Sequence, residues 1–161
     1  MLKKLSEEQL EWLLEAGVEE FARHGPAGAN MRAIADRAGI SVGVLYKYYA
    51  DKGAFFRACL DRSLEALDRT LAEVTAEEAD FREYARRMIR ALLRFSREHG
   101  AYVRLYCTLT ASGGEGAVRL AGEIEGITAR LYTRAVAAGQ AAGDLREAMD
   151  PALSAFFFAS L

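Results

Sequence analysis

Residues 31–60, MRAIADRAGISVGVLYKYYADKGAFFRACL, hold the pattern that decides the fold. Four apolar side chains within 31–38 are spaced three, one and three positions apart, which places them on one face of a helix. Asn30 directly before them is a favourable N-cap. Gly39 directly after them suits the positive φ at the end of a helix. The sequence therefore predicts a short helix over 31–38 that ends in a glycine turn.

A second short helix follows this turn. Ser41 is a suitable N-cap, and the pattern after it predicts a helix over 42–49. Two helices of about eight residues, joined by a three-residue turn that begins with glycine, are typical of a helix-turn-helix. We assign this motif to about 30–49.

The rest of the chain has the same helical periodicity, and strand-like alternation is absent. The 161 residues are 52% hydrophobic and 27% charged with two prolines, which is typical of a well-packed helical protein. We predict an all-α fold. Further helices are expected from the Ser6 cap to HGPAG at 24–28, from the Asp51 cap to about 74, over 80–99, over 101–111, between the loops at 112–116 and 142–150, and after Asp150-Pro151. In the helix over 80–99 the residues expected to point inward are Tyr84, Met88, Leu92 and Phe95. In the helix between the two loops they are Val118, Ile124, Ile127, Leu131 and Val136.

The composition excludes several classes of protein. Cys59 and Cys107 are far apart in helical contexts, which favours buried apolar thiols over a disulfide. The sequence has no CxxC and no Cys/His cluster, so we expect no metal and no cofactor. The start is too acidic for a signal peptide, and no run approaches the roughly 18 apolar residues of a membrane span. We therefore expect a cytoplasmic protein without membrane contact.

An enzyme is not expected. His24 and His99 stand alone near helix ends, where a satisfied or exposed histidine is the usual interpretation. The loop at 112–116 is short and lacks the lysine of a phosphate-binding loop. No serine or cysteine has a nucleophile motif around it. The many Glu/Arg mixtures indicate solvated helix faces.

The helix over 42–49 has an unusual outer surface. At 100° per residue, Leu45 and Tyr49 define the buried side and Lys47 points almost directly away from it. One interpretation is an ordinary solvated face with amphipathic side chains. The other is a DNA-reading helix, because this motif presents its second helix to a major groove. Residues 23–57 favour the second interpretation, since they hold six basic against two acidic residues in a chain of net charge −2.

Residues 13–25, LLEAGVEEFARHG, and 31–60 resemble the TetR family of transcriptional regulators. The resemblance rests on uninterrupted spacing between Gly25, Ile34-Ala35, Ala38-Gly39, Leu45-Tyr46 and Lys52. It implies an all-helical homodimeric repressor whose first three helices bind a double-stranded DNA operator and whose C-terminal body binds a small molecule. The implied domains are a DNA-binding domain over 1–52 and an effector-binding and dimerisation domain over 53–161.

The family's DNA contacts carry over by position. Lys47 stands where an aromatic residue or histidine is frequent, and Val44 where threonine or alanine is usual, so the operator cannot be transferred from relatives. Tyr46 and Lys52 would contact the DNA backbone. The full set implied is Arg32, Val42, Gly43, Val44, Tyr46, Lys47, Tyr48 and Lys52.

The resemblance also implies an effector pocket in the body, and the apolar lining suits a lipophilic effector. Helical spacing makes plain core the competing interpretation for most of this lining. Polar contacts could come from His99, Tyr102, Tyr106 and Arg130. The residues expected to line the pocket are Leu67, Met88, Leu92, Phe95, Tyr102, Leu105, Tyr106, Leu109, Ile127 and Leu131.

The family dimerises through its last two helices, and this chain holds only the opening of the first of them. The run Phe156-Phe157-Phe158 would be an exposed apolar patch unless covered. We therefore expect the C-terminal end to be incomplete. The alternative function is a helical protein-interaction module that does not bind DNA.

Overall fold

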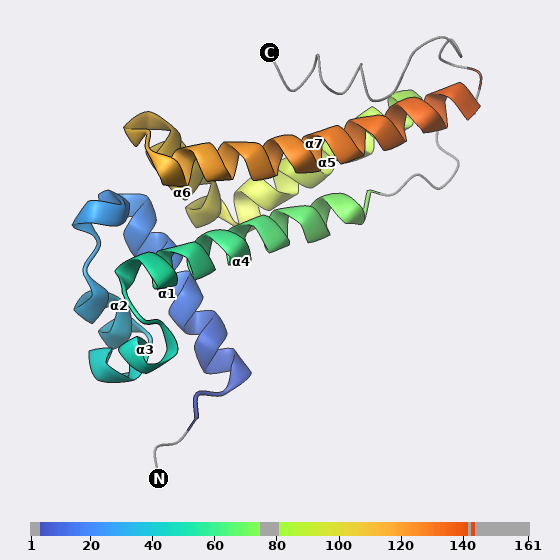
Figure 1. The fold of residues 1–161 in the computed structure, drawn as a ribbon. Coiled ribbons are helices and arrows are strands. Elements are labelled where there is room, and N and C mark those ends of the chain that lie inside the picture. Colours follow the sequence, from blue (N-terminus) through green and yellow to red (C-terminus); the bar gives the residue numbers. More distant parts are fainter. Residues whose placement is uncertain (1–3, 75–80, 142, 144–161) are drawn as a thin grey trace. The chain divides into compact units, whose positions relative to one another are not determined.

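The computed structural model describes residues 4–74, 81–141 and 143 (Figure 1). These residues form helices and connecting turns without a strand, which confirms the all-α prediction. They fall into two compact units, one within Met1–Ser63 and His99–Ala117, the other within Leu64–Glu98 and Val118–Leu161. The helices are α1 (Glu7–Gly28), α2 (Met31–Arg37), α3 (Val42–Tyr48), α4 (Lys52–Ala72), α5 (Phe81–Glu98), α6 (Gly100–Ser112) and α7 (Glu115–Ala141).

The start of α1 is fixed by reciprocal capping. The Gln9 backbone N–H donates to Ser6 Oγ at 3.2 Å, and the Ser6 N–H donates to Gln9 Oε1 at 3.0 Å. This capping box satisfies two N–H groups at the helix start. Near its end α1 is interrupted at Gly25, whose φ is 68°. The prediction that glycine and proline end the helix here is confirmed, although a last turn resumes at Pro26.

The helix-turn-helix has the predicted caps. Asn30 Oδ1 accepts from the N–H groups of Arg32 and Ala33 at 3.0 and 3.3 Å. Gly39 has a φ of 68°, a left-handed conformation that glycine adopts without the steric cost of a Cβ. Ser41 Oγ accepts from the Val44 N–H at 3.3 Å. Both helices end one residue before their predicted ends.

The first unit is built around side chains from α1 to α4. Gly17 allows the close approach of α4, because a Cβ on it would lie 2.6 Å from Phe55 Cζ and from Cys59 Sγ. In the same unit α6 packs along α1, and Thr108 Oγ1 donates to the Ala22 carbonyl at 2.8 Å. The side chains with no exposed area include Leu13, Val18, Phe21, Ile34, Leu45, Phe55 and Cys59.

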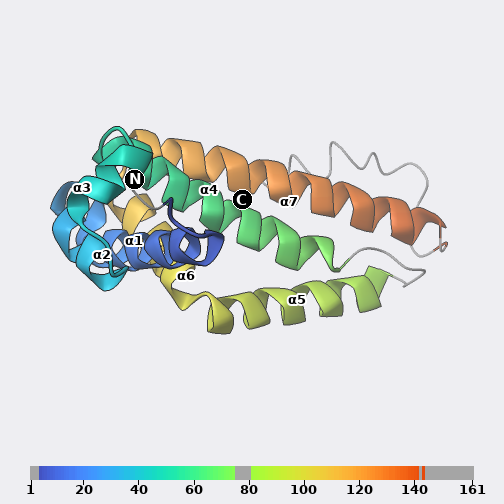
Figure 2. The same cartoon turned by 90° about the horizontal axis from the view of Figure 1, so that it is seen from below.

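The second unit joins the end of α4 to α5 and α7, and in the view of Figure 2 α4 runs between the other two helices. The Tyr84 hydroxyl, on α5, donates to the Leu131 carbonyl, on α7, at 3.1 Å. The apolar core of this second unit consists of Leu71, Val74, Tyr84, Ala91 and Ile127, with Leu64, Leu67, Met88 and Leu131 packed against them.

Several predicted positions are wrong. Leu92 is 45% exposed, because the buried face of α5 runs through Ala91, one position or 100° away. Val118 is 74% exposed, because it lies two positions before the buried Leu120 on α7. Residues 115–116 belong to α7 rather than to a loop, because the positive φ at 113 and 114 ends α6 within two residues.

The cysteine prediction holds in part. Both thiols are free, Cys59 is buried, and burial raises its pKa. Cys107 is exposed, so the expectation of a buried thiol is wrong there. The predicted helix after Asp150-Pro151 and the Phe156–158 run lie outside the described residues.

Candidate nucleic-acid interface

The inner side of α3 anchors the helix in the first unit. Leu45 has no exposed area, as predicted. Tyr49, the C-cap of α3, is half-buried and packs edge-on against Phe55, with ring centroids 4.9 Å apart. These contacts fix the rotation of α3 about its axis and so determine which residues it turns outward.

The outer side of α3 is exposed. Tyr46 is 44% exposed, and Lys47 and Gly43 are exposed beside it. The nearest atom to a Cβ built on Gly43 is Ser41 Oγ at 3.9 Å, so a binding partner could approach the backbone closely. Val42 and Val44 are partly exposed. With Tyr48, which is also exposed, the structure places six of the eight predicted DNA-contact residues on α3.

Tyr48 has a contact that the sequence did not indicate. Its hydroxyl accepts a hydrogen bond from the Leu5 backbone N–H at 2.6 Å, and Leu5 itself is buried. The segment before α1 is therefore tied to α3. The two residues are 43 positions apart and share no sequence motif. No local sequence pattern could therefore have predicted the contact.

Lys52 and Arg32 stand at the edges of the motif. Lys52 Nζ donates to the Ala27 carbonyl at 2.7 Å, which links the start of α4 to the end of α1. Its ammonium has two further donors for another acceptor. The exposed Arg32 side chain makes no hydrogen bond or ion pair with any residue that the structure describes.

Two carboxylates of α1 hold α2 in place. Glu20 is buried and accepts from the Asn30 N–H at 3.0 Å, at the start of α2. Glu19 pairs with Arg37 at the end of α2. The hydrogen bond from Arg37 lowers the pKa of Glu19, and the charges of Arg37 and Arg23 add to this effect. The partners of these two carboxylates are 10 and 18 positions away along the chain, so no local sequence pattern indicated the contacts.

The ten predicted effector-lining residues are divided between the two units. Tyr106 is 39% exposed and Leu92 is 45% exposed, so neither lies in a described core. His99 stacks on Tyr102 with centroids 5.1 Å apart, and Arg130 pairs with Asp68 at 3.3 Å. Leu67, Met88, Ile127 and Leu131 lie together in the second unit, where Phe95 is also buried, whereas Tyr102, Leu105 and Leu109 are buried in the first.

Among residues 4–74, 81–141 and 143, none of the helices combines the length and the hydrophobicity that a membrane span requires. The same residues contain no group of three or more His, Cys, Asp or Glu side chains arranged to hold a metal ion.

Relatives share the segment that carries this interface. Residues 13–59 match the family described as bacterial regulatory proteins, tetR family. The HTH-type transcriptional repressor SCO4008 of Streptomyces coelicolor is 42% identical over 52 residues, 32% of this chain and 27% of that protein. The HTH-type transcriptional activator FasR of Mycolicibacterium smegmatis is 34% identical over 83 residues, 52% of this chain and 38% of that protein. The matched segment thus spans well under half of these curated relatives.

Solved structures share the fold over nearly the whole chain. FadR from Bacillus subtilis, in complex with stearoyl-CoA, has a TM-score of 0.76 at 16% identity and covers 94% of this chain and 81% of its own. SmeT, the repressor of a Stenotrophomonas maltophilia multidrug efflux pump, has a TM-score of 0.68 at 21% identity and covers 93% and 72%. Residues 13–59, which include the capped helix-turn-helix, thus match the tetR family of bacterial regulatory proteins, and the chain shares the all-helical fold of these solved structures.

Proposed function

We propose that this protein is a sequence-specific DNA-binding repressor that is released from its operator by a small, lipophilic effector. The observation that carries the proposal is the exposed outer face of α3, held outward by the buried Leu45 within the segment that matches the family. A buried inner side and a polar, partly aromatic outer side are what a helix needs to lie in a major groove.

The contacts divide into two kinds. Phosphate oxygens, which position the protein without selecting a sequence, would be bound by Tyr46, Lys47 and Lys52. Arg32 can donate either to a phosphate or to a guanine. Gly43 lets the backbone approach base edges, while Val42 and Val44 can contact a thymine methyl. The Tyr48 hydroxyl already accepts from Leu5, and its own hydrogen can still be donated to a phosphate.

The direction of regulation is supported by one relative. SCO4008, named as a repressor, has the higher identity of the two named relatives, whereas FasR is named as an activator. We therefore propose repression. A reporter gene placed behind the selected operator should be expressed less when the protein is present, and increased expression would reverse the assignment.

The effector proposal rests on chemistry and on fold. The second unit has an apolar core, and the shared fold includes a structure that holds stearoyl-CoA. We propose a homodimer formed through C-terminal helices, in which the effector shifts the population toward a spacing of the two DNA-reading heads that no longer fits successive major grooves.

Selection of bound sequences from random duplex DNA tests the function directly. A palindromic enriched site would support a dimeric operator binder, and a single half-site would support a monomeric reader. No enrichment by a folded protein would leave the alternative, a helical protein-interaction module without DNA binding. A binding signal that weakens steeply with salt would count against that alternative.

Two variants test whether the outer side chains of α3 contact the operator. Lys47→Ala and Tyr46→Phe should each weaken operator binding while helical content stays unchanged. Arg69→Ala is the matched control, because it removes an exposed charge on α4 outside the motif. If both variants bind the operator as tightly as the control does, the assignment of α3 as the reading helix is wrong.

A further inference from the structure

The helix α5 concentrates positive charge. Its 18 residues contain six arginines and two glutamates, although the whole chain has a net charge of −2. Four of these arginines are spaced three, four and three positions apart, which places them on one side of the helix. A helix face with this much charge of one sign is destabilised by self-repulsion unless counter-charges are supplied.

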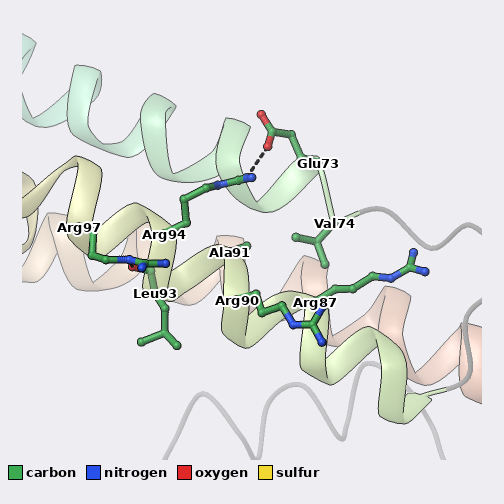
Figure 3. A pocket seen from close by; sticks show the side chains of 8 residues that line it. All are labelled: Glu73, Val74, Arg87, Arg90, Ala91, Leu93, Arg94 and Arg97. Carbon is green, nitrogen blue, oxygen red and sulfur yellow. Dashed lines mark hydrogen bonds and ion pairs between the residues drawn. The ribbon is translucent and has the colours of Figure 1, made fainter.

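These four arginines line a groove in the second unit (Figure 3). Its volume is about 460 Å³, a size that suits a small organic molecule. Glu73 and Val74, the two residues directly after α4, contribute one wall, and α5 contributes the other. The lining residues are Glu73, Val74, Arg87, Arg90, Ala91, Leu93, Arg94 and Arg97.

The groove has more positive charge than its own carboxylates neutralise. Glu73 is the single carboxylate in the lining, and it pairs with Arg94 at 2.5 Å. Arg87 pairs with Glu83 of the same helix at 3.3 Å. Arg97 Nε donates to the Leu93 carbonyl at 3.3 Å. Arg90 makes no ion pair with the residues that the structure describes.

The ion pairs that exist can be exchanged. The side chains of Arg94 and Glu73 are 47% and 65% exposed, and exposed pairs of this kind contribute little stability. An incoming anion could therefore replace Glu73 on Arg94 at small cost. Guanidinium groups suit this role, since they bind phosphate and carboxylate oxygens in a two-pronged geometry.

The groove also has apolar surface. Leu93 lies in its lining and is 57% exposed, while Val74 and Ala91 form a buried apolar part of the wall. We propose that this groove binds a small amphipathic anion, with Arg90, Arg94 and Arg97 holding a phosphate or carboxylate group and Leu93 contacting the apolar part. Its role as an effector site rests on the regulatory function proposed above, whereas the binding itself does not.

Calorimetric titration with octyl phosphate tests the binding. The wild-type protein should bind it saturably, and about tenfold more tightly than inorganic phosphate or octanol, because only octyl phosphate offers both parts of the ligand. Weak or undetectable binding of octyl phosphate by the folded protein would overturn the proposal. Equal affinity for inorganic phosphate would also overturn it, because the apolar contact would then contribute nothing.

A matched pair of double variants locates the site. Arg90→Gln with Arg97→Gln should weaken octyl phosphate binding at least about tenfold. Arg82→Gln with Arg86→Gln removes the same charge from exposed positions of the same helix outside the groove and should change the affinity less than about twofold. Equal losses in the two double variants would indicate diffuse charge attraction and overturn the site. Circular dichroism should show unchanged helical content in both double variants.

Operator binding without ligand separates this inference from the proposed function. If the groove variant alone loses operator affinity, its arginines contact DNA phosphates and the small-molecule site is wrong. If octyl phosphate binds as expected and no operator exists, the site stands and the regulatory function fails. If the operator is bound and octyl phosphate is not, the function stands and this inference fails.

Discussion

The hydroxyl of Tyr48 accepts a 2.6 Å hydrogen bond from the backbone N–H of Leu5. This contact ties the segment before α1 to the end of α3, the helix proposed to read DNA. Leu5 itself is buried, and the neighbouring Lys4 is exposed. The Tyr48 side chain therefore stabilises the fold and also belongs to the proposed DNA-binding surface.

Tyr48→Phe should lower the free energy of unfolding by about 1 kcal/mol, because it leaves the Leu5 N–H without its partner. Urea denaturation measures the change. Tyr46→Phe is the control, since the Tyr46 hydroxyl makes no hydrogen bond with the described residues and its loss should leave stability unchanged. Equal stability of the two variants would show that the Leu5 contact contributes nothing.

Alanine substitutions of Lys47 and Lys52 should affect operator affinity alike but the free energy of unfolding differently. Lys47→Ala removes an exposed side chain and should weaken DNA binding without affecting unfolding. Lys52→Ala also removes the 2.7 Å hydrogen bond to the Ala27 carbonyl, so it should cost about 1 kcal/mol of stability in addition. Operator titrations and urea curves on both variants make the comparison, and a stability loss in Lys47→Ala would contradict it.

Gly43→Ala should increase stability and decrease operator affinity. Alanine is favoured over glycine in a helix by up to about 1 kcal/mol, and the space around Gly43 is open. The added methyl group would nevertheless stand between the α3 backbone and the DNA. The midpoint of thermal unfolding should therefore rise, while the operator affinity measured by titration should fall. Unchanged operator affinity would remove Gly43 from the proposed interface.

Gly17→Ala should destabilise the first unit by about 1 to 3 kcal/mol, because its Cβ would overlap Phe55 and Cys59. Gly122→Ala on α7 is the matched control, since among the described residues no neighbour lies within 4 Å of the Cβ built there. It should stabilise the protein by up to about 1 kcal/mol. Denaturation of the two variants gives the comparison, and tolerance of Gly17→Ala would mean that the α1–α4 packing adjusts easily.

Glu19 should make stability depend on pH in the acid range. Its hydrogen bond with Arg37 lowers its pKa below the usual 4.5, so the unfolded chain takes up a proton at higher pH than the folded one. The stabilisation is complete above the unfolded pKa and is lost as pH falls through the folded pKa. The urea midpoints of the wild type and Glu19→Gln should therefore converge as pH is lowered from about 6 to 3. A constant difference would show that Glu19 titrates alike in both states.

The local parts of the fold were predictable from the sequence. The caps at Ser6, Asn30 and Ser41 each bond backbone groups two or three residues away, so a short window of sequence contains both partners. Gly39 likewise marks a turn through its own φ. The outer residues of α3 followed from the helical period once Leu45 was placed inside. The inward assignments of Leu92 and Val118 failed because an apolar side chain does not show by itself whether a neighbouring helix covers it.

The sequence by itself determined the helices, their caps and the face that α3 exposes, because these depend on residues within a few positions of one another. The tertiary structure decided which distant residues meet: Leu5 with Tyr48, Lys52 with Ala27, and Ala22 with Thr108, 86 positions away. The arginine groove belongs to this second class. On sequence its arginines indicated only a solvated helix face, and they line a groove because packing brings Glu73 and Val74 alongside α5.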